Sequence, residues 1–198
     1  FERTPLFGRT IVVTRSRTQA STLARELRGL GARVLLCPTI HITAPEDTGI
    51  LDQAVADVAT FDGVVLTSPN AVEAFFTALT RCGRDARALA HCLLAVTGPA
   101  TAEALAGHGL RADVMPSEYT AKGLGKALRE HTDLHGKRLL LPRSSLAPPD
   151  LPHLLHEAGA EVTDIVAYCT VPAAVDPALL ERLHAGDVDA ITFTSSST

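Results

Sequence analysis

The feature that most constrains the fold of this 198-residue chain is an internal repeat. Three blocks recur in the same order, displaced by 128, 128 and 127 residues. The blocks and their second copies are Gly8–Ser16 and Gly136–Ser144, Leu30–Val34 and Ala158–Val162, and Phe61–Ser68 and Val188–Ser195. An ordered repeat at nearly one offset predicts two structurally related units.

Short β-type runs alternate with helical periodicity in both units. The predicted strands are Thr10–Thr14, Arg33–Cys37, Asp62–Leu66, His91–Val96, Arg138–Leu141 and Val162–Val171. The predicted helices contain Ala20–Leu27, Val72–Leu79, Ala100–Ala106, Leu124–Leu128 and Leu151–Ala158. Such alternation predicts an α/β fold with parallel sheets covered by helices, as in doubly wound proteins.

The repeat also predicts that its second copy is incomplete at the C-terminal end. In the first copy, Phe61–Ser68 is followed by Gly98–Thr101 and Ala112–Pro116, and their counterparts would fall beyond Thr198. We therefore expect about 50 further residues in the second copy.

Charge and hydropathy exclude several classes of protein. A net charge of −4 provides no basic field for nucleic acid. The longest apolar runs are far shorter than the roughly 20 residues that cross a bilayer, and no leader precedes Phe1, so we expect a cytoplasmic protein without membrane contact. The four cysteines form no Cys-x-x-Cys pair and the histidines no ligand set, so no metal site is expected.

The clearest local signal is a strand that ends where a helix begins, at Leu66–Val72. Ser68 fits the N-cap and Pro69 the first helical position. Gly98–Ala102 repeats the arrangement, and Thr194–Ser197 begins the same turn in the other unit. Capping alone explains any one of these residues, whereas several helix starts at the carboxyl ends of strands favour a cleft for carboxylates or phosphates.

Tyr168 is the second candidate, and two interpretations of it remain open. Alternation along its strand predicts that Val166, Tyr168 and Thr170 share one face. A half-buried strand aromatic and a functional phenol both fit that pattern. Tyr119, the other tyrosine, precedes a helix start and is expected in a loop.

Three basic residues near strand ends or a helix start, Arg15, Lys122 and Arg143, could meet ligand carboxylates or lie in solvent. The sequence contains no dinucleotide fingerprint, phosphate-binding Gly-Lys-Ser/Thr loop or Gly-x-Ser-x-Gly elbow. No cofactor is expected.

Taken in order, these segments resemble the uroporphyrinogen-III synthase family. They are Gly8–Arg15, Leu30–Val34, Pro38–Ile40, Thr67–Val72, Ala95–Ala102, Val166–Thr170 and Asp189–Ser195. No single motif is specific, but the ordered set covers essentially the whole chain.

The resemblance implies two flavodoxin- or Rossmann-like domains joined by a two-stranded linker. The first domain would be discontinuous and incomplete, formed by residues 1–38 and 172–198. Residues 39–43 and 167–171 would form the linker strands, and residues 44–166 the second domain. The substrate would lie in the cleft between the domains.

The resemblance also implies an activity that needs no cofactor. The enzyme would close hydroxymethylbilane into uroporphyrinogen III, inverting the last pyrrole ring and losing water. Departure of the hydroxyl gives an azafulvene, which forms a spiro intermediate before the ring is inverted. Tyr168 would assist that departure, with a modest effect because a phenol is a weak acid.

In family terms, the other site residues would bind or orient the substrate, partly through main-chain N–H groups. They are Thr67, Ser68, Asn70, Gly98, Ala100, Thr101, Lys122, Arg15, Ser144, Thr194, Ser195 and Ser197. A monomer is expected, handed substrate by neighbouring pathway enzymes or fused to one, because Phe1–Gly8 resembles the linker after a uroporphyrinogen-III methyltransferase domain. A non-catalytic tetrapyrrole-binding domain and a two-domain solute-binding protein are the alternatives.

Overall fold

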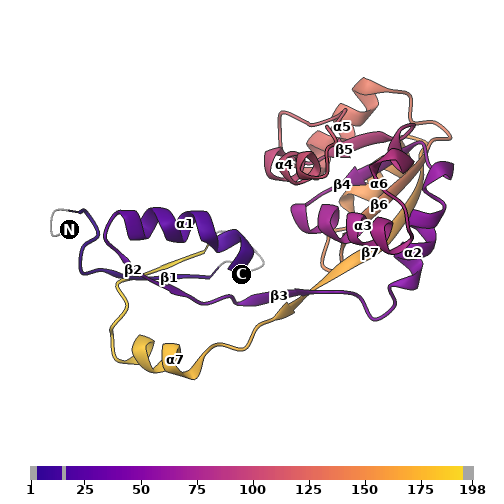
Figure 1. Cartoon of the computed structure of the whole chain (residues 1–198). Helices are drawn as coiled ribbons and strands as arrows, with labels where there is room; N and C mark the ends of the chain where they lie inside the picture. Colours follow the sequence, from indigo (N-terminus) through magenta and orange to yellow (C-terminus); the bar gives the residue numbers. More distant parts are fainter. Residues whose placement is uncertain (1–3, 15–16, 194–198) are drawn as a thin grey trace. The chain divides into compact units, whose positions relative to one another are not determined.

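The computed structural model describes residues 4–14 and 17–193. They form a mixed α/β fold with parallel sheets, as the alternating pattern predicts (Figure 1). By their contacts, residues group into two compact units: Phe1–Ile42 with Thr170–Thr198, and Thr43–Cys169. We call these the first and the second unit.

The first unit contains a three-stranded parallel sheet in the order β2-β1-β8. Its elements are β1 (Thr10–Val13), α1 (Arg17–Gly29), β2 (Arg33–Leu36), α7 (Pro177–His184) and β8 (Ala190–Thr192). Helices α1 and α7 lie on opposite sides of the sheet (Figure 1). On the α7 side, Leu179 packs in one buried cluster with Val12 and Cys37.

The second unit is built on a sheet in the order β3-β7-β6-β4-β5. Its strands are β3 (Ile40–Thr43), β4 (Gly63–Leu66), β5 (Leu93–Val96), β6 (Arg138–Ser144) and β7 (Glu161–Pro172). The pairs β7–β6, β6–β4 and β4–β5 are parallel. Both β3 and β7 continue across the boundary between the two units.

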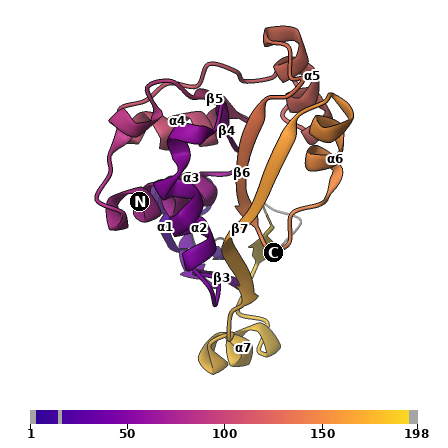
Figure 2. The same cartoon turned by 90° about the vertical axis from the view of Figure 1, so that its right-hand side faces the viewer.

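Two layers of helices cover this sheet (Figure 2). One layer is α2 (Gly49–Ala56), α3 (Pro69–Arg81) and α4 (Pro99–Gly107), with the short helices η1 (Val58–Thr60) and η2 (Ala86–Leu89); the other is α5 (Ala121–His131) and α6 (Asp150–Glu157). Successive strand side chains point to opposite faces, so Val64 and Leu66 pack in the cluster under α3, whereas Val65 packs in the cluster under α5.

The sequence repeat is also a repeat of strand pairing. By sequence, β1, β2 and β8 correspond to β6, β7 and β4, and the orders β2-β1-β8 and β7-β6-β4 correspond strand for strand. The register is the same as well: Thr10 pairs with Arg33 in one sheet, and Arg138 pairs with Glu161, 128 residues later, in the other.

In both copies, an aspartate at the start of the third repeated strand joins that strand to the first repeated strand. The Asp62 carboxylate accepts hydrogen bonds from Arg138 N (2.9 Å) and Lys137 Nζ (2.9 Å). Its counterpart Asp189 accepts from Thr10 N (2.7 Å) and an Arg9 guanidinium nitrogen (2.6 Å). In each copy the backbone hydrogen bond, followed by the basic side chain, holds the pKa of the aspartate below its usual range.

The predicted alternation along β7 is wrong at Tyr168, because the strand contains a bulge. Arg143 of β6 pairs with Val166, but the next residue, Ser144, pairs with Tyr168, so Ala167 is an extra residue. Val166 is consequently exposed, whereas Tyr168 is buried in the same cluster as Ala167. An inserted residue increases the local twist and redirects the side chain that follows it.

Strand β5 begins two residues later than predicted. Cys92 N donates to Leu89 O (2.9 Å), which closes the turn of η2 and keeps His91 and Cys92 out of the sheet. The first pairing of β5 is Leu93 with Gly63.

Candidate functional site

The order of the strands places a candidate site between β4 and β6. After β4 the chain enters α3 on one face of the sheet, and after β6 it enters α6 on the other face. Adjacent strands whose connections depart to opposite faces leave a crevice at their carboxyl ends, where open α/β sheets bind ligands. Thr67 and Ser68 follow β4, Ser144 ends β6, and Tyr168 lies beside Ser144 on β7.

Ser68 is the N-cap of α3, as the sequence predicts. Its backbone is extended, Pro69 occupies the first helical turn, and Ser68 Oγ accepts a hydrogen bond from Ala71 N (3.1 Å). The same Oγ lies 2.9 Å from the Tyr168 hydroxyl, and either oxygen can donate the proton. Two candidates that are 100 residues apart in sequence are therefore in direct contact.

Tyr168 is 8% exposed and packs in the cluster that contains Leu66, Val72 and Phe75. A buried ring restricts its hydroxyl to one place, which here is the N-terminal end of α3. A helix N-terminus carries a partial positive charge, so this position favours negative charge on a nearby oxygen.

The loop after β6 is fixed to β7 by two contacts. Ser145 N donates to Tyr168 O (3.0 Å), and the Arg143 guanidinium binds the Asp164 carboxylate while donating to Pro148 O. Arg143 was expected either to meet a ligand carboxylate or to lie in solvent. Its side chain is instead largely buried and holds the loop that follows Ser144.

The helix starts at α4 and α5 form a second group of candidates at the same edge of the sheet. Gly98 caps α4 without a side-chain acceptor, and Thr101 is buried one turn later. The Tyr119 ring lies against Gly98, where an added Cβ would be 3.2 Å from the ring. Tyr119 is in a loop, as expected, and 58% exposed. The contact of Tyr119 with Gly98 brings together two segments that lie about 20 residues apart in the sequence.

The remaining candidates are distributed as follows. Thr67 and Asn70 flank the Ser68 cap and are half-buried. Ala100 and Lys122 lie in the first turns of α4 and α5, and both are exposed. Arg15, Thr194, Ser195 and Ser197 lie outside the described residues.

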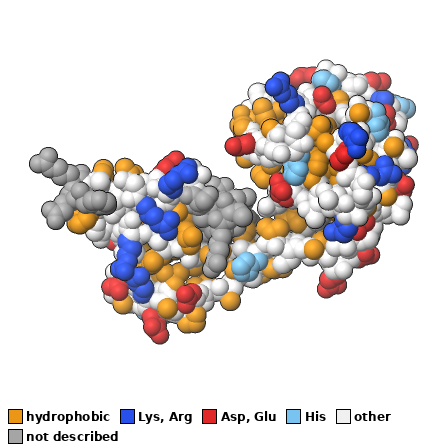
Figure 3. Space-filling model, viewed as in Figure 1, with side chains coloured by type: hydrophobic (Ala, Val, Ile, Leu, Met, Phe, Trp, Pro, Cys, Tyr) orange, Lys and Arg blue, Asp and Glu red, His pale blue; other side chains and the backbone are white. Residues whose placement is uncertain are grey.

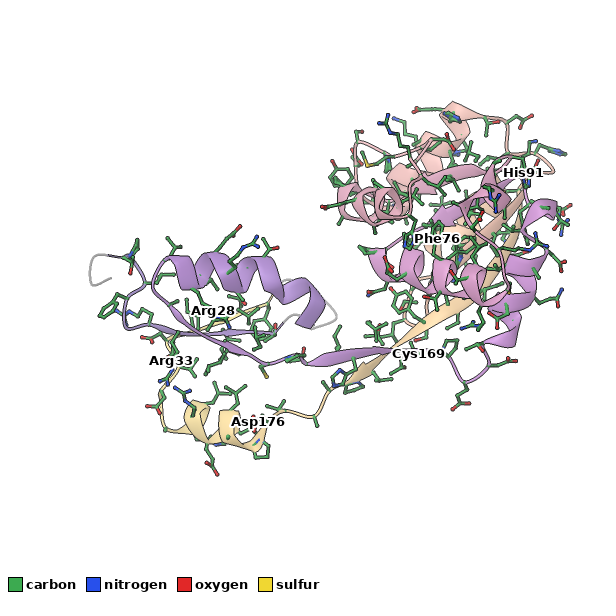
Figure 4. All side chains as sticks on the ribbon, viewed as in Figure 1. Arg28, Arg33, Phe76, His91, Cys169 and Asp176 are labelled. Carbon is green, nitrogen blue, oxygen red and sulfur yellow. The ribbon has the colours of Figure 1, made fainter. Side chains whose placement is uncertain are left out.

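Two hollows in the second unit lie away from this edge. One, of about 170 Å³, is at the amino ends of the strands and is lined by Asp62, His91 and Lys137; Figure 4 shows His91 at that end of the unit. A larger one, of about 760 Å³, is lined by Ile50 of α2, Arg138 of β6 and Asp164 of β7. On the face of this unit seen in Figure 3, basic and acidic side chains are interspersed.

Across residues 4–14 and 17–193, no three His, Cys, Asp or Glu side chains are grouped closely enough to hold a metal ion. Among the helices of this described part, none has both the length and the hydropathy to cross a membrane.

Comparison with known sequences gives a consistent set of relatives. The family model described as "Uroporphyrinogen-III synthase HemD" matches residues 21–198. The chain is 36% identical over 196 residues to the uroporphyrinogen-III synthase of Synechococcus elongatus, covering 98% of this chain and 73% of that protein. It is 30% identical over 200 residues to the porphyrin biosynthesis protein HemD of Ruminiclostridium josui, covering all of this chain and 39% of that protein.

The fold is also similar to a solved structure. A mutant uroporphyrinogen III synthase from the extremely thermophilic bacterium Thermus thermophilus superposes with a TM-score of 0.65 at 24% identity. The match covers 94% of this chain and 73% of that one.

Proposed function

This chain belongs to the uroporphyrinogen-III synthase family, and from this membership we propose that it converts hydroxymethylbilane into uroporphyrinogen III. The reaction closes the macrocycle, inverts the last pyrrole ring and releases water, and it needs no cofactor. The observation that carries the proposal is the family match over residues 21–198. A non-catalytic tetrapyrrole-binding role is not favoured, because the relatives are named as synthases.

Tyr168 is the proposed catalytic residue. Its hydroxyl, beside the N-terminus of α3, donates a hydrogen bond to the departing hydroxyl of the substrate. The geometry that supports this role is the buried ring and the 2.9 Å contact with Ser68 Oγ. The enzyme's larger task is to hold the linear substrate so that closure with inversion is faster than spontaneous closure without it.

Substrate carboxylates are proposed to bind local donors, because a net charge of −4 offers no general attraction for a polyanion. The open start of α4 supports this idea, since Gly98 provides no side-chain acceptor and leaves Ala100 N–H for a ligand. The proposed set is Thr67, Asn70, Gly98, Ala100, Thr101, Lys122, Ser144 and, outside the described residues, Arg15, Thr194, Ser195 and Ser197. The resemblance adds Ser68, whose hydroxyl contacts Tyr168 and Ala71 N instead.

The domain organisation is proposed as the resemblance implies it. Residues 1–38 and 172–198 form the first domain, residues 44–166 the second, and residues 39–43 and 167–171 a two-stranded linker. The two contact-defined units and the adjacent strands β3 and β7 support this division. We also propose a cytoplasmic monomer that is fused to, or receives substrate from, a neighbouring pathway enzyme.

The test is product analysis. Purified protein is incubated with hydroxymethylbilane, the products are oxidised to porphyrins, and the I and III isomers are separated chromatographically. The proposal predicts an excess of the III isomer over a protein-free control, in which spontaneous closure gives the I isomer. A product mixture identical to that control would refute the activity.

A further inference from the structure

The contact between Ser68 and Tyr168 allows a more specific inference about the roles of the two hydroxyls. Ser68 Oγ already accepts one hydrogen bond, from Ala71 N (3.1 Å), and it lies 2.9 Å from the Tyr168 hydroxyl. A serine hydroxyl has one proton and two lone pairs. Both contacts of Ser68 are therefore within the protein, and a third contact with substrate is not needed to explain its position.

Two arrangements of the hydroxyl protons satisfy the 2.9 Å contact. If Tyr168 donates to Ser68, the phenol proton is occupied. If Ser68 donates to Tyr168, the phenol proton remains free for a ligand. Only the second arrangement leaves the phenol proton for substrate, as the proposed role of Tyr168 requires. The hydrogen bond that Ser68 accepts from Ala71 N–H strengthens its hydroxyl as a donor in that arrangement.

We propose that Ser68 is a positioning residue for Tyr168, whose hydroxyl oxygen it holds by donating a hydrogen bond, rather than a residue that binds substrate. This inference rests on the proposed function. As the C–O bond of the substrate's hydroxymethyl group breaks, its oxygen takes the Tyr168 proton and leaves as water. The pyrrole nitrogen supplies the electron pair for the azafulvenium ion, and the phenol oxygen keeps the pair of its former O–H bond. The proton released when the macrocycle closes restores the phenol.

The hydrogen bond from Ser68 strengthens during this step. Negative charge develops on the Tyr168 oxygen, and hydrogen bonds to charged oxygens are roughly twice as strong as those between neutral groups. An interaction that is stronger in the transition state than in the ground state raises kcat without changing KM. The partial positive charge at the N-terminus of α3 also stabilises the negative charge that develops on the Tyr168 oxygen.

The kinetic test compares Ser68→Ala, Ser68→Thr and Tyr168→Phe with the wild type. Ser68→Ala should lower kcat by about 10- to 100-fold, with KM changed by less than about 2-fold. Ser68→Thr retains a hydroxyl and should recover most of the lost kcat. In a Tyr168→Phe background, Ser68→Ala should have little further effect on kcat.

Thr120→Ala is the matched control for capping. Thr120 Oγ1 caps α5 by accepting from Gly123 N (3.0 Å), with the same geometry that Ser68 uses at α3. Both alanine variants should lower the thermal midpoint by about 2–4 °C. Only Ser68→Ala should lower kcat. A higher KM at unchanged kcat in Ser68→Ala, or additive losses in the double variant, would overturn the proposal.

A measurement without substrate separates this inference from the proposed function. The chain has two tyrosines, so ¹³Cζ-labelled tyrosine gives two resonances, and Tyr168→Phe assigns them. The Tyr168 resonance should move in Ser68→Ala and return in Ser68→Thr. An unmoved resonance refutes the Ser68–Tyr168 hydrogen bond, whereas a wild-type protein that forms only the I isomer refutes the activity.

Discussion

Replacing Asp62 by alanine should destabilise the second unit by about 2 kcal/mol. The Asp62 carboxylate joins β4 to β6 by accepting from Arg138 N and Lys137 Nζ, each at 2.9 Å. The counterpart of this aspartate makes equivalent contacts in the first unit. Because both copies of the repeat contain the same aspartate contact, we infer that this contact stabilises the fold.

The magnitude follows from the two contacts and their exposure. A hydrogen bond to a charged group contributes about 1.5–3 kcal/mol. The Asp62 side chain is 40% exposed, so in the alanine variant water can hydrogen-bond Arg138 N–H in place of the carboxylate. We therefore take the lower end of the range, about 1.5 kcal/mol, as the contribution of this hydrogen bond to stability. The ion pair with Lys137 is similarly exposed and adds about 0.5 kcal/mol.

Urea unfolding measures this difference. With a slope of about 2 kcal/mol per molar, Asp62→Ala should lower the midpoint by about 1 M at pH 7. Asp62→Asn keeps an acceptor for Arg138 N–H but loses the charge, and should lower the midpoint by about half as much. Asp187, whose side chain is exposed, is the control position, and Asp187→Ala should leave the midpoint unchanged.

The pH dependence gives a second check. Because the pKa of Asp62 is lowered in the folded protein, its stabilisation is present above the ordinary carboxyl pKa of about 4. That stabilisation is lost as the pH falls through the lower, folded value. The difference between wild type and Asp62→Ala should therefore stay near about 2 kcal/mol between about pH 5 and 7, and shrink below about pH 4. A midpoint within about 0.2 M of the wild type, or a difference that persists unchanged in acid, would refute the reasoning.

Three further predictions concern other positions. Lys122→Ala should raise KM about 5-fold and change kcat less than about 2-fold in steady-state kinetics, because the loss of one exposed cation weakens substrate binding. Gly63→Ala should destabilise the protein by about 2 kcal/mol in urea unfolding, because the new Cβ would lie 2.9 Å from Leu93 O. Burial raises the pKa of the Cys92 thiol to about 11, so a disulfide reagent at about pH 8 should leave Cys92 unmodified until urea is added.

The sequence predicted the strands and helices that are specified by neighbouring residues. The apolar run of β4 followed by Ser68 and Pro69 specifies a strand, a cap and a helix start, and the structure contains all three. Helix α7 carried equally clear signals that were not used: Asp176 caps it, Pro177 begins it, and Leu179 faces the core. Helix α2 was also missed, although Leu51, Ala54 and Val55 have helical spacing.

The geometry of the candidate site could not be predicted from the sequence of any one strand, because it depends on how the strands pair. The bulge at Ala167 arises from the pairing of β7 with β6, and it decides which face Tyr168 occupies. The contact of Tyr168 with Ser68 depends in turn on the order β7-β6-β4. Alternation along a single strand predicts neither feature, so the sequence identified both residues but not their contact.

The order of the strands has a consequence for synthesis on the ribosome. Strands β1 and β2 emerge before the second unit, but β8, which pairs with β1, emerges only after all of it. At translation rates of about 5–20 residues per second, roughly 8–30 s separate β2 from β8. The second unit is continuous in the chain and can fold during that interval. The first unit thus begins before the second unit but cannot pair β1 with β8 until after it, and one edge of its central strand β1 stays unpaired during that interval.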